Sequence, residues 1–273
     1  MTYSTFHLLF TLPILALLGV VAWRTAKGRP ADYAHRWHAW LFLSVIAFIY
    51  TTPWDIYLVG QGVWGYPEGS VLGTVAGVPV EEYAFFLIQT AITTLWFFIC
   101  LGRLRPGGQT LAPPPSLRSQ QRARWTLPCL GYLALVGVYA LQFEQGTYFG
   151  LILVWACPIL VLHWLVGGSW LADNLKLIAW GVLPPTLYFW VADWVAIYTG
   201  AWHINPALSL GPSLVGLPLE EAVFFLVTNI MVVQGLYLYL AVLEQWESVR
   251  LRLLTVGRRF GLTLEGGRPH VSR

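Results

Sequence analysis

Seven long apolar runs constrain the fold of this chain more than any other feature. They cover about residues 5–23, 37–54, 79–101, 125–142, 148–166, 176–198 and 217–243. A helix needs roughly 20 apolar residues to cross the hydrocarbon core of a bilayer. Only 11% of the residues are charged, whereas about a quarter are charged in a soluble domain. We therefore expect an all-α integral membrane protein with seven transmembrane helices.

The positive charges predict the orientation of these helices. All 16 lysine and arginine residues lie between runs one and two, three and four, or five and six, or after run seven. Because lysine and arginine concentrate in cytoplasmic loops, we expect a multi-pass protein with its N-terminus outside and its C-terminus in the cytoplasm. The first run has neither a basic lead nor a small-residue cleavage site, so it is expected to stay as a span. The net charge of +3 gives no indication of nucleic-acid binding.

Two similar stretches indicate an internal duplication. Residues 78–90 read VPVEEYAFFLIQT and residues 217–229 read LPLEEAVFFLVTN; in addition, Asp55 and Trp64 have the same spacing as Asp193 and Trp202. The added crossing of a connector helix should make the repeats parallel and place both glutamate pairs at the same, non-cytoplasmic end. The expected order is a first three-helix repeat (1–101), a cytoplasmic linker and connector helix (102–142), a second three-helix repeat (143–247) and a basic cytoplasmic tail (248–273).

Each glutamate pair is expected in the first turn of a helix. Pro79 and Pro218 stand just before the pairs, and proline is tolerated in a first turn because its missing N–H is not needed there. The helix dipole favours negative charge at this end, so the glutamates could serve only to complete helix ends. Helical periodicity nevertheless turns one glutamate of each pair toward the bundle. The candidate catalytic residues are Glu81, Glu82, Glu220 and Glu221.

Two aspartates are expected near the glutamates. Asp55 and Asp193 lie at the ends of the second and sixth runs, and the expected topology leaves no lysine or arginine at that end of the bundle. Carboxyl groups crowded in a poorly hydrated site share protons. A carboxyl group that keeps its proton is a usable general acid, and an ionised neighbour is a usable base. We therefore expect Asp55 and Asp193 to support the acid/base chemistry.

Aromatic residues near both motifs predict a lining for a substrate. Aromatic faces can stabilise a cation, as chemistry that protonates an alkene would require, although tryptophan also anchors helices at membrane interfaces. No dinucleotide-binding glycine motif in a strand–helix setting and no metal-ligand cluster is evident, so neither cofactor nor metal is expected. The expected substrate-binding residues are Trp54, Trp64, Phe85, Phe86, Trp194, Trp202, Phe224 and Phe225.

The doubled motif resembles a known family. The pattern Pro-x-Glu-Glu-x-x-Phe-Phe, at Pro79–Phe86 and Pro218–Phe225, is similar to that of the lycopene cyclase domain of the membrane-embedded, heterodimer-type class, here as a fused single chain. The resemblance covers about residues 1–245 and implies cyclisation of the ends of lycopene to β-ionone rings, giving γ-carotene and β-carotene without net redox. It also implies linear carotenoids and membrane lipid as partners. Which glutamate donates the proton and which accepts it is left open.

Two other functions fit part of the pattern. A proton-coupled transporter with three-plus-one-plus-three helices could use the membrane carboxylates as a relay. However, Pro184 and Pro185 have no counterparts at positions 46 and 47, which weakens this interpretation. A related carotenoid hydratase, in which water captures the cation, is the second alternative. The sequence leaves open whether one or both ends are cyclised, the ring isomer, the number of sites and the oligomeric state.

Overall fold

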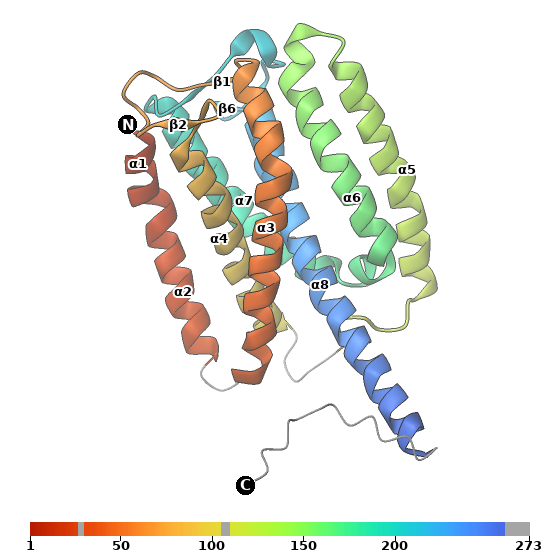
Figure 1. Ribbon diagram of the computed structural model, residues 1–273. Coiled ribbons are helices and arrows are strands. Elements are labelled where there is room, and N and C mark those ends of the chain that lie inside the picture. Colours follow the sequence, from red (N-terminus) through yellow and green to blue (C-terminus); the bar gives the residue numbers. More distant parts are fainter. Residues whose placement is uncertain (27–29, 105–109, 260–273) are drawn as a thin grey trace.

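The computed structural model describes residues 1–26, 30–104 and 110–259 and shows a bundle of helices (Figure 1). Six two-residue strands and two short 3-10 turns, η2 (Glu144–Gly146) and η3 (Pro206–Leu208), lie between the helices in the described residues. The expectation of an all-α architecture is therefore confirmed. The helices are α1 (Tyr3–Phe6), which continues through the π-helical turn η1 (His7–Thr11) into α2 (Leu12–Ala26), and then α3 (Pro30–Gly60), α4 (Val80–Leu104), α5 (Leu117–Ala140), α6 (Thr147–Asp173), α7 (Leu175–Tyr198) and α8 (Leu219–Arg259).

Six helical segments in the described part of the chain are long and apolar enough to cross a membrane, as expected for a multi-pass protein. The seventh expected crossing forms helix α5, which lies along α6 (Figure 1) but is not one of the six. Its first two turns carry arginines, which leaves residues 125–140 as its apolar part, shorter than the roughly 20 residues of a typical span. The six are Tyr3–Thr25, Trp37–Gly60, Val80–Leu104, Glu144–Asp173, Leu175–Tyr198 and Leu219–Trp246.

Helices α4 and α8, which carry the glutamate motifs, are the more deeply buried of these segments. In their most apolar parts, 67% of the α4 residues and 56% of the α8 residues are buried, against 22% for α3. A chain of polar contacts joins them in the core: the Thr93 hydroxyl donates to Asn229 Oδ1 at 2.7 Å, and Asn229 Nδ2 donates to Thr186 Oγ1 of α7 at 3.0 Å. Thr93, Asn229 and Thr186 thus satisfy one another within this apolar region, as burial of polar groups favours.

Two tight hairpins lead into these helices. Strand β2 (Thr74–Val75) pairs with β3 (Val78–Pro79), and β5 (Ser213–Leu214) pairs with β6 (Leu217–Pro218), both antiparallel. Each hairpin has a two-residue turn with positive φ at both positions: 51° and 85° at Ala76 and Gly77, 54° and 91° at Val215 and Gly216. Such turns match the right-handed twist of the strands. Each hairpin ends at the proline of the motif, so the chain passes directly from the turn into the glutamate-bearing helix.

The loops before α4 and α8 meet at one end of the bundle. Strand β1 (Trp64–Gly65), from the loop after α3, pairs antiparallel with β4 (His203–Ile204), from the loop after α7. The Asn205 N–H donates to the Val63 carbonyl at 2.9 Å beside this pair. Both glutamate pairs therefore lie at the same end of the bundle, as expected from the sequence.

Helices α5 and α6 approach each other closely at two glycines. A methyl group added at Gly150 would come within 2.8 Å of the Gly137 carbonyl oxygen, and one added at Gly137 would come within 2.8 Å of Leu153 Cβ. Small residues allow such close backbone approach between membrane helices. The contact of α5 with the bundle therefore depends on the absence of side chains at these two positions.

We expect Gly150→Val to push α5 away from α6 and to lower stability by about 1–3 kcal/mol, the usual cost of overpacking a core. The measurement is thermal or denaturant unfolding of the purified protein in detergent. Gly131→Val is the control, because a methyl group at Gly131 of α5 meets no atom within 4 Å among the described residues. Equal destabilisation by both substitutions would show that helix propensity, and not this contact, is responsible.

Candidate active site

The four glutamates of the two motifs are buried at the start of α4 and α8. Their exposed fractions are 5% for Glu81, 6% for Glu82, 0% for Glu220 and 3% for Glu221. They occupy the first helical turn, as expected from the prolines before them, where the unpaired N–H groups and the helix dipole favour negative charge. None of the four faces bulk solvent, so each carboxyl group requires partners within the protein.

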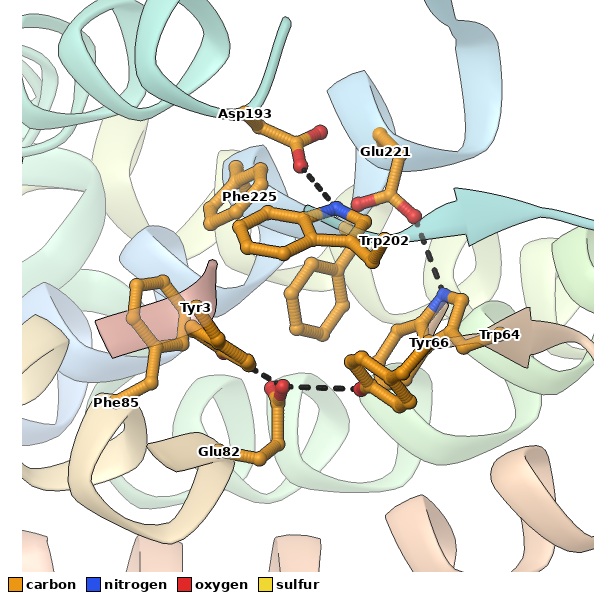
Figure 2. A pocket seen from close by; sticks show the side chains of 10 residues that line it. Tyr3, Trp64, Tyr66, Glu82, Phe85, Asp193, Trp202, Glu221 and Phe225 are labelled. Carbon is orange, nitrogen blue, oxygen red and sulfur yellow. Dashed lines mark hydrogen bonds between the residues drawn. The ribbon is translucent and has the colours of Figure 1, made fainter. Parts of the chain in front are cut away.

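Glu82 and Glu221 face a common pocket. Figure 2 shows Glu82 entering from one side of this pocket and Glu221 and Asp193 from the other. The pocket has an empty volume of about 350 Å³, which includes space open to solvent. Its lining combines three carboxyl groups with aromatic rings. The lining residues are Tyr3, Trp64, Tyr66, Glu82, Phe85, Asp193, Trp202, Glu221, Phe224 and Phe225.

Two phenols hold the carboxyl group of Glu82. The Tyr3 hydroxyl donates to Glu82 Oε2 at 2.6 Å, and the Tyr66 hydroxyl donates to the same oxygen at 3.2 Å (Figure 2). Burial raises the pKa of the Tyr66 phenol well above its usual value, and the nearby carboxyl groups of Glu82 and Asp55 raise it further. The Tyr66 hydroxyl therefore keeps its proton at neutral pH and remains a donor.

Glu221 is held in a related way, with one difference. The Tyr148 hydroxyl donates to Glu221 Oε1 at 2.6 Å, and the indole Nε1–H of Trp64 donates to the same oxygen at 3.2 Å. Tyr148 lies in the first turns of α6, whereas Trp64 lies in the loop between α3 and α4. The glutamate of the second motif thus takes one of its two donors from the loop beside the first motif.

Glu81 and Glu220 bind the loops instead of lining the pocket. Glu81 Oε1 accepts hydrogen bonds from the Leu72 N–H and the Ser4 hydroxyl, both at 2.9 Å. Glu220 Oε1 accepts the Leu210 N–H at 2.6 Å. In both cases the loop before the helix is attached to the first residue of the pair, which fixes the position of the second residue.

The two aspartates are both near the pocket glutamates but have different surroundings. Asp193 is 1% exposed, interacts electrostatically with Glu221, and accepts a hydrogen bond from Trp202 Nε1 at 3.0 Å. Asp55 is 0% exposed and interacts electrostatically with Glu82. Within the described residues, neither carboxyl oxygen of Asp55 has a hydrogen-bond partner. The donors to these carboxyl groups include phenols, indoles, a serine hydroxyl and backbone amides.

Phenylalanines form the apolar wall of the pocket. The rings of Phe189 and Phe225 are stacked with centroids 5.5 Å apart, and Phe85 meets Phe225 edge-on at 6.1 Å. Phe224 lies 5.2 Å from Phe225. Phe85, Phe224 and Phe225 thus line the pocket together with Glu82 and Glu221.

The other predicted aromatic residues are more dispersed. Trp64 and Trp202 line the pocket. Trp54 lies behind its wall, stacked on Trp155 at 4.6 Å and on Phe224 at 5.8 Å. Phe86 lines a neighbouring cavity. Trp194 does not line the pocket; it is 40% exposed and stacks on Tyr198.

Four residues of the site were not among the site residues predicted from the sequence: Tyr3, Tyr66, Tyr148 and Phe189. Tyr3 and Tyr148 supply the shortest hydrogen bonds to the pocket glutamates, and Phe189 is a fully buried part of the wall. The signal for Tyr3 and Tyr148 is the dipeptide Thr-Tyr, which stands at residues 2–3 and 147–148, at the start of helices α1 and α6. Phe189 has no such signal, because it lies within a long apolar run.

The described residues contain no group of three or more histidine, cysteine, aspartate or glutamate side chains that could hold a metal ion. Gly60, Gly62 and Gly65 do have the spacing of a dinucleotide-binding glycine motif. However, they run from the last residue of helix α3 to the second residue of strand β1, whereas the motif requires a strand before the glycines and a helix after them. The arrangement instead offers proton-donating and proton-accepting groups beside aromatic faces that can stabilise a cation.

Comparisons with known proteins agree with this chemistry. The family model for lycopene cyclase matches residues 1–100 and 145–240. A lycopene beta-cyclase of Halobacterium salinarum is 38% identical over 90% of this chain and 99% of its own length. A bifunctional lycopene cyclase/phytoene synthase of Colletotrichum graminicola is 37% identical over 86% of this chain, which spans 40% of that longer protein. A protein of the same description from Aspergillus niger is 40% identical over 76% of this chain and 36% of its own length.

No solved structure matches the chain. The family model nevertheless covers more than half of it, and the matched segments contain both glutamate motifs as well as Tyr3, Tyr66 and Tyr148. The similarity to the Halobacterium salinarum protein extends over nearly the whole of that relative. The chain therefore belongs to the lycopene cyclase family.

Proposed function

We propose that this protein is a lycopene β-cyclase, which converts the linear ends of lycopene to β-ionone rings and gives γ-carotene and then β-carotene. The observation that carries the proposal is that Glu82 and Glu221 face one aromatic-lined pocket from two different helices. Membership of the family and the names of the relatives support the choice of substrate. The transporter alternative gains no support from these comparisons.

The proposed reaction is an isomerisation driven by proton transfer. A carboxylic acid protonates the terminal double bond of the substrate and produces a tertiary cation. An internal double bond then attacks this cation and closes the ring, and a carboxylate removes a ring proton to form the product. The proton gained equals the proton lost and no electrons are transferred, so the reaction consumes neither an oxidant nor a reductant.

The pocket residues have distinct roles in this proposal. Glu82 and Glu221 exchange protons with the substrate, while Asp55 and Asp193 hold the further protons that the cluster shares. Phe85, together with the other rings of the pocket, presents its face to the cation. The attraction between a cation and an aromatic face strengthens where water is excluded. The remaining contacts to this cation come from Trp64, Trp202, Phe224 and Phe225, with Trp54 and Phe86 supporting them from behind; we assign Trp194 to the outer surface.

Glu81 and Glu220 are proposed to position the pocket glutamates. Each accepts a hydrogen bond from a backbone N–H of the loop that precedes its own helix. His7 adds a further link on the first side, since its Nε2 lies 3.0 Å from the Glu81 carbonyl oxygen. Tyr3 and Tyr148 orient the two pocket carboxyl groups toward the substrate.

The proposed membrane arrangement keeps seven spans in two parallel three-helix repeats, with α5 as the connector. The proposed units are residues 1–101, 102–142, 143–247 and 248–273. The equivalent hairpins before α4 and α8 and the equivalent loop contacts of Glu81 and Glu220 support this arrangement. The N-terminus and the pocket lie on the outer side, the C-terminus lies in the cytoplasm, and linear carotenoids reach the site from the surrounding lipid.

Expression in a lycopene-accumulating host tests the proposed function directly. We expect a change of pigment from red to orange, with γ-carotene and β-carotene detected by chromatography. A hydrated acyclic product would instead identify the hydratase. Unchanged lycopene in cells whose membranes contain the folded protein would reject the proposal.

We expect Glu82→Gln and Glu221→Gln each to lower turnover by at least about 100-fold, the effect of removing a general acid or base. The amide keeps the size of the side chain and can still accept hydrogen bonds from the tyrosines, so the fold should be retained. The measurement is the rate of product formation by purified protein in lipid. Glu68→Gln, at an exposed loop position, is the control for removal of a carboxyl group. Wild-type turnover in both pocket variants would rule out their role in proton transfer.

The adjacent glutamates provide a sharper comparison. Glu81→Gln and Glu220→Gln keep a carbonyl oxygen to accept the loop N–H, so we expect turnover within about 10-fold of the wild type. Glu81→Ala and Glu220→Ala remove that acceptor, so they should lower both the turnover and the unfolding temperature. A loss of turnover in Glu81→Gln as large as that in Glu82→Gln, at unchanged stability, would contradict the division of roles within each pair.

A further inference from the structure

A second cavity lies next to the carboxyl-lined pocket, between α3, α4, α6 and α8. We call it the core cavity; it has an empty volume of about 690 Å³ and is lined by fifteen residues, most of them apolar or aromatic. The largest rings in its wall are those of Tyr50, Phe86, Trp155 and Phe224. None of the candidate acid/base groups lines it, so the proton-transfer chemistry does not explain why it exists.

The core cavity and the pocket share part of their lining. Phe224 contributes to both spaces, and the adjacent residues Phe85 and Phe86 line the pocket and the core cavity, respectively. On α8 the same succession runs from Glu221 through Phe224 to Thr228 and Val232. The two spaces therefore lie next to each other and share the wall at Phe224.

The core cavity has an elongated shape. On α3 its lining extends from Leu43 to Thr51, on α6 from Trp155 to His163, and on α8 from Phe224 to Val232. Each of these stretches covers eight residue steps, which is about 12 Å along a helix. The agreement among three helices indicates a channel parallel to the helix axes. Such a space fits a narrow chain rather than a compact molecule.

The aromatic rings in its lining favour a conjugated chain over a saturated one. Trp155 and Phe224 both line the core cavity. Aromatic faces can stack on a flat conjugated surface. A saturated acyl chain offers no such surface.

We propose that the core cavity is the binding site for the conjugated chain of a linear polyene whose end group lies between Glu82 and Glu221. The inference rests on the proposed function, because that function places the end group in the pocket. It adds that recognition depends on the length of the chain behind the reacting end. The substrate class is a long, all-hydrocarbon linear isoprenoid with conjugated double bonds.

The structure offers a matched comparison for a test. Ala47 lines the core cavity on α3, and Ala91 lines a separate groove between α2, α3 and α4. Both alanines are partly buried within a helix. The groove of Ala91 shares no lining residue with the carboxyl pocket. Phenylalanine at Ala47 would fill the core cavity, whereas phenylalanine at Ala91 adds the same volume elsewhere.

The experiment compares two substrates: lycopene and a shortened linear isoprenoid polyene that keeps the same end group. We expect Ala47→Phe to lower kcat/KM for lycopene by at least about 10-fold, a typical effect of steric mismatch in an apolar pocket. The value for the short substrate should stay within about twofold of the wild type, as should both values for Ala91→Phe. Thr228→Phe fills the core cavity from α8 and should give the same result if Ala47→Phe does not fold.

The outcomes separate this inference from the function on which it rests. Equal loss for both substrates in folded variants, or no loss for lycopene, would overturn the core cavity as the chain site and would leave lycopene cyclisation intact. Failure of the wild-type protein to cyclise either substrate would overturn the proposed function and this inference together. A loss confined to the long substrate, found only in the core-cavity variants, would establish it.

Discussion

The burial of four glutamate carboxyl groups at one end of an apolar bundle is the constraint on which the rest of the structure depends. A charged or polar group removed from water is costly unless the protein supplies hydrogen bonds. The donors for these groups come from separate segments: Tyr3 from the first helix, Tyr148 from α6, Trp64 from a loop, and backbone amides from the loops before α4 and α8. The glutamates can therefore be buried only when these segments are assembled, which couples formation of the pocket to folding of that end of the bundle.

The sequence predicted much of this arrangement because local rules determine it. The prolines and glutamates of each motif define a first helical turn, and the helical period places Phe85 behind Glu82 and Phe224 behind Glu221. The apolar runs gave the helices, although α5 falls short of a typical span because its first turns carry arginines. The spacing of Asp55 and Asp193 to their tryptophans indicated that these residues belong with the motifs, and both aspartates lie beside the pocket glutamates.

What the sequence could not provide depends on contacts between distant segments. The periodicity turned one glutamate of each pair toward the bundle, but it could not show that Glu81 and Glu220 bind loop amides. That depends on where Leu72 and Leu210 lie in space. Tyr3 lies 79 residues from its partner Glu82, and Tyr148 lies 73 residues from Glu221. Trp194 points outward because it follows Asp193 in helix α7. Successive residues of a helix point in different directions, so Trp194 faces away when Asp193 faces the pocket.

The two halves of the site are similar in sequence but not equivalent in structure. Trp64 and Trp202 hold equivalent positions, yet Trp202 donates to Asp193, whereas Trp64 donates to Glu221 and leaves Asp55 without a donor among the described residues. Tyr66 donates to Glu82, and the corresponding position in the second half is Ile204. Acid/base catalysis needs one group that gives a proton and another that takes one, and different surroundings are what allow similar carboxyl groups to take opposite roles. Two identical halves would give each carboxyl group the same surroundings. The donation of the Trp64 indole to Glu221, and the Tyr66 hydroxyl that has no counterpart at Ile204, instead give the two pocket glutamates different surroundings.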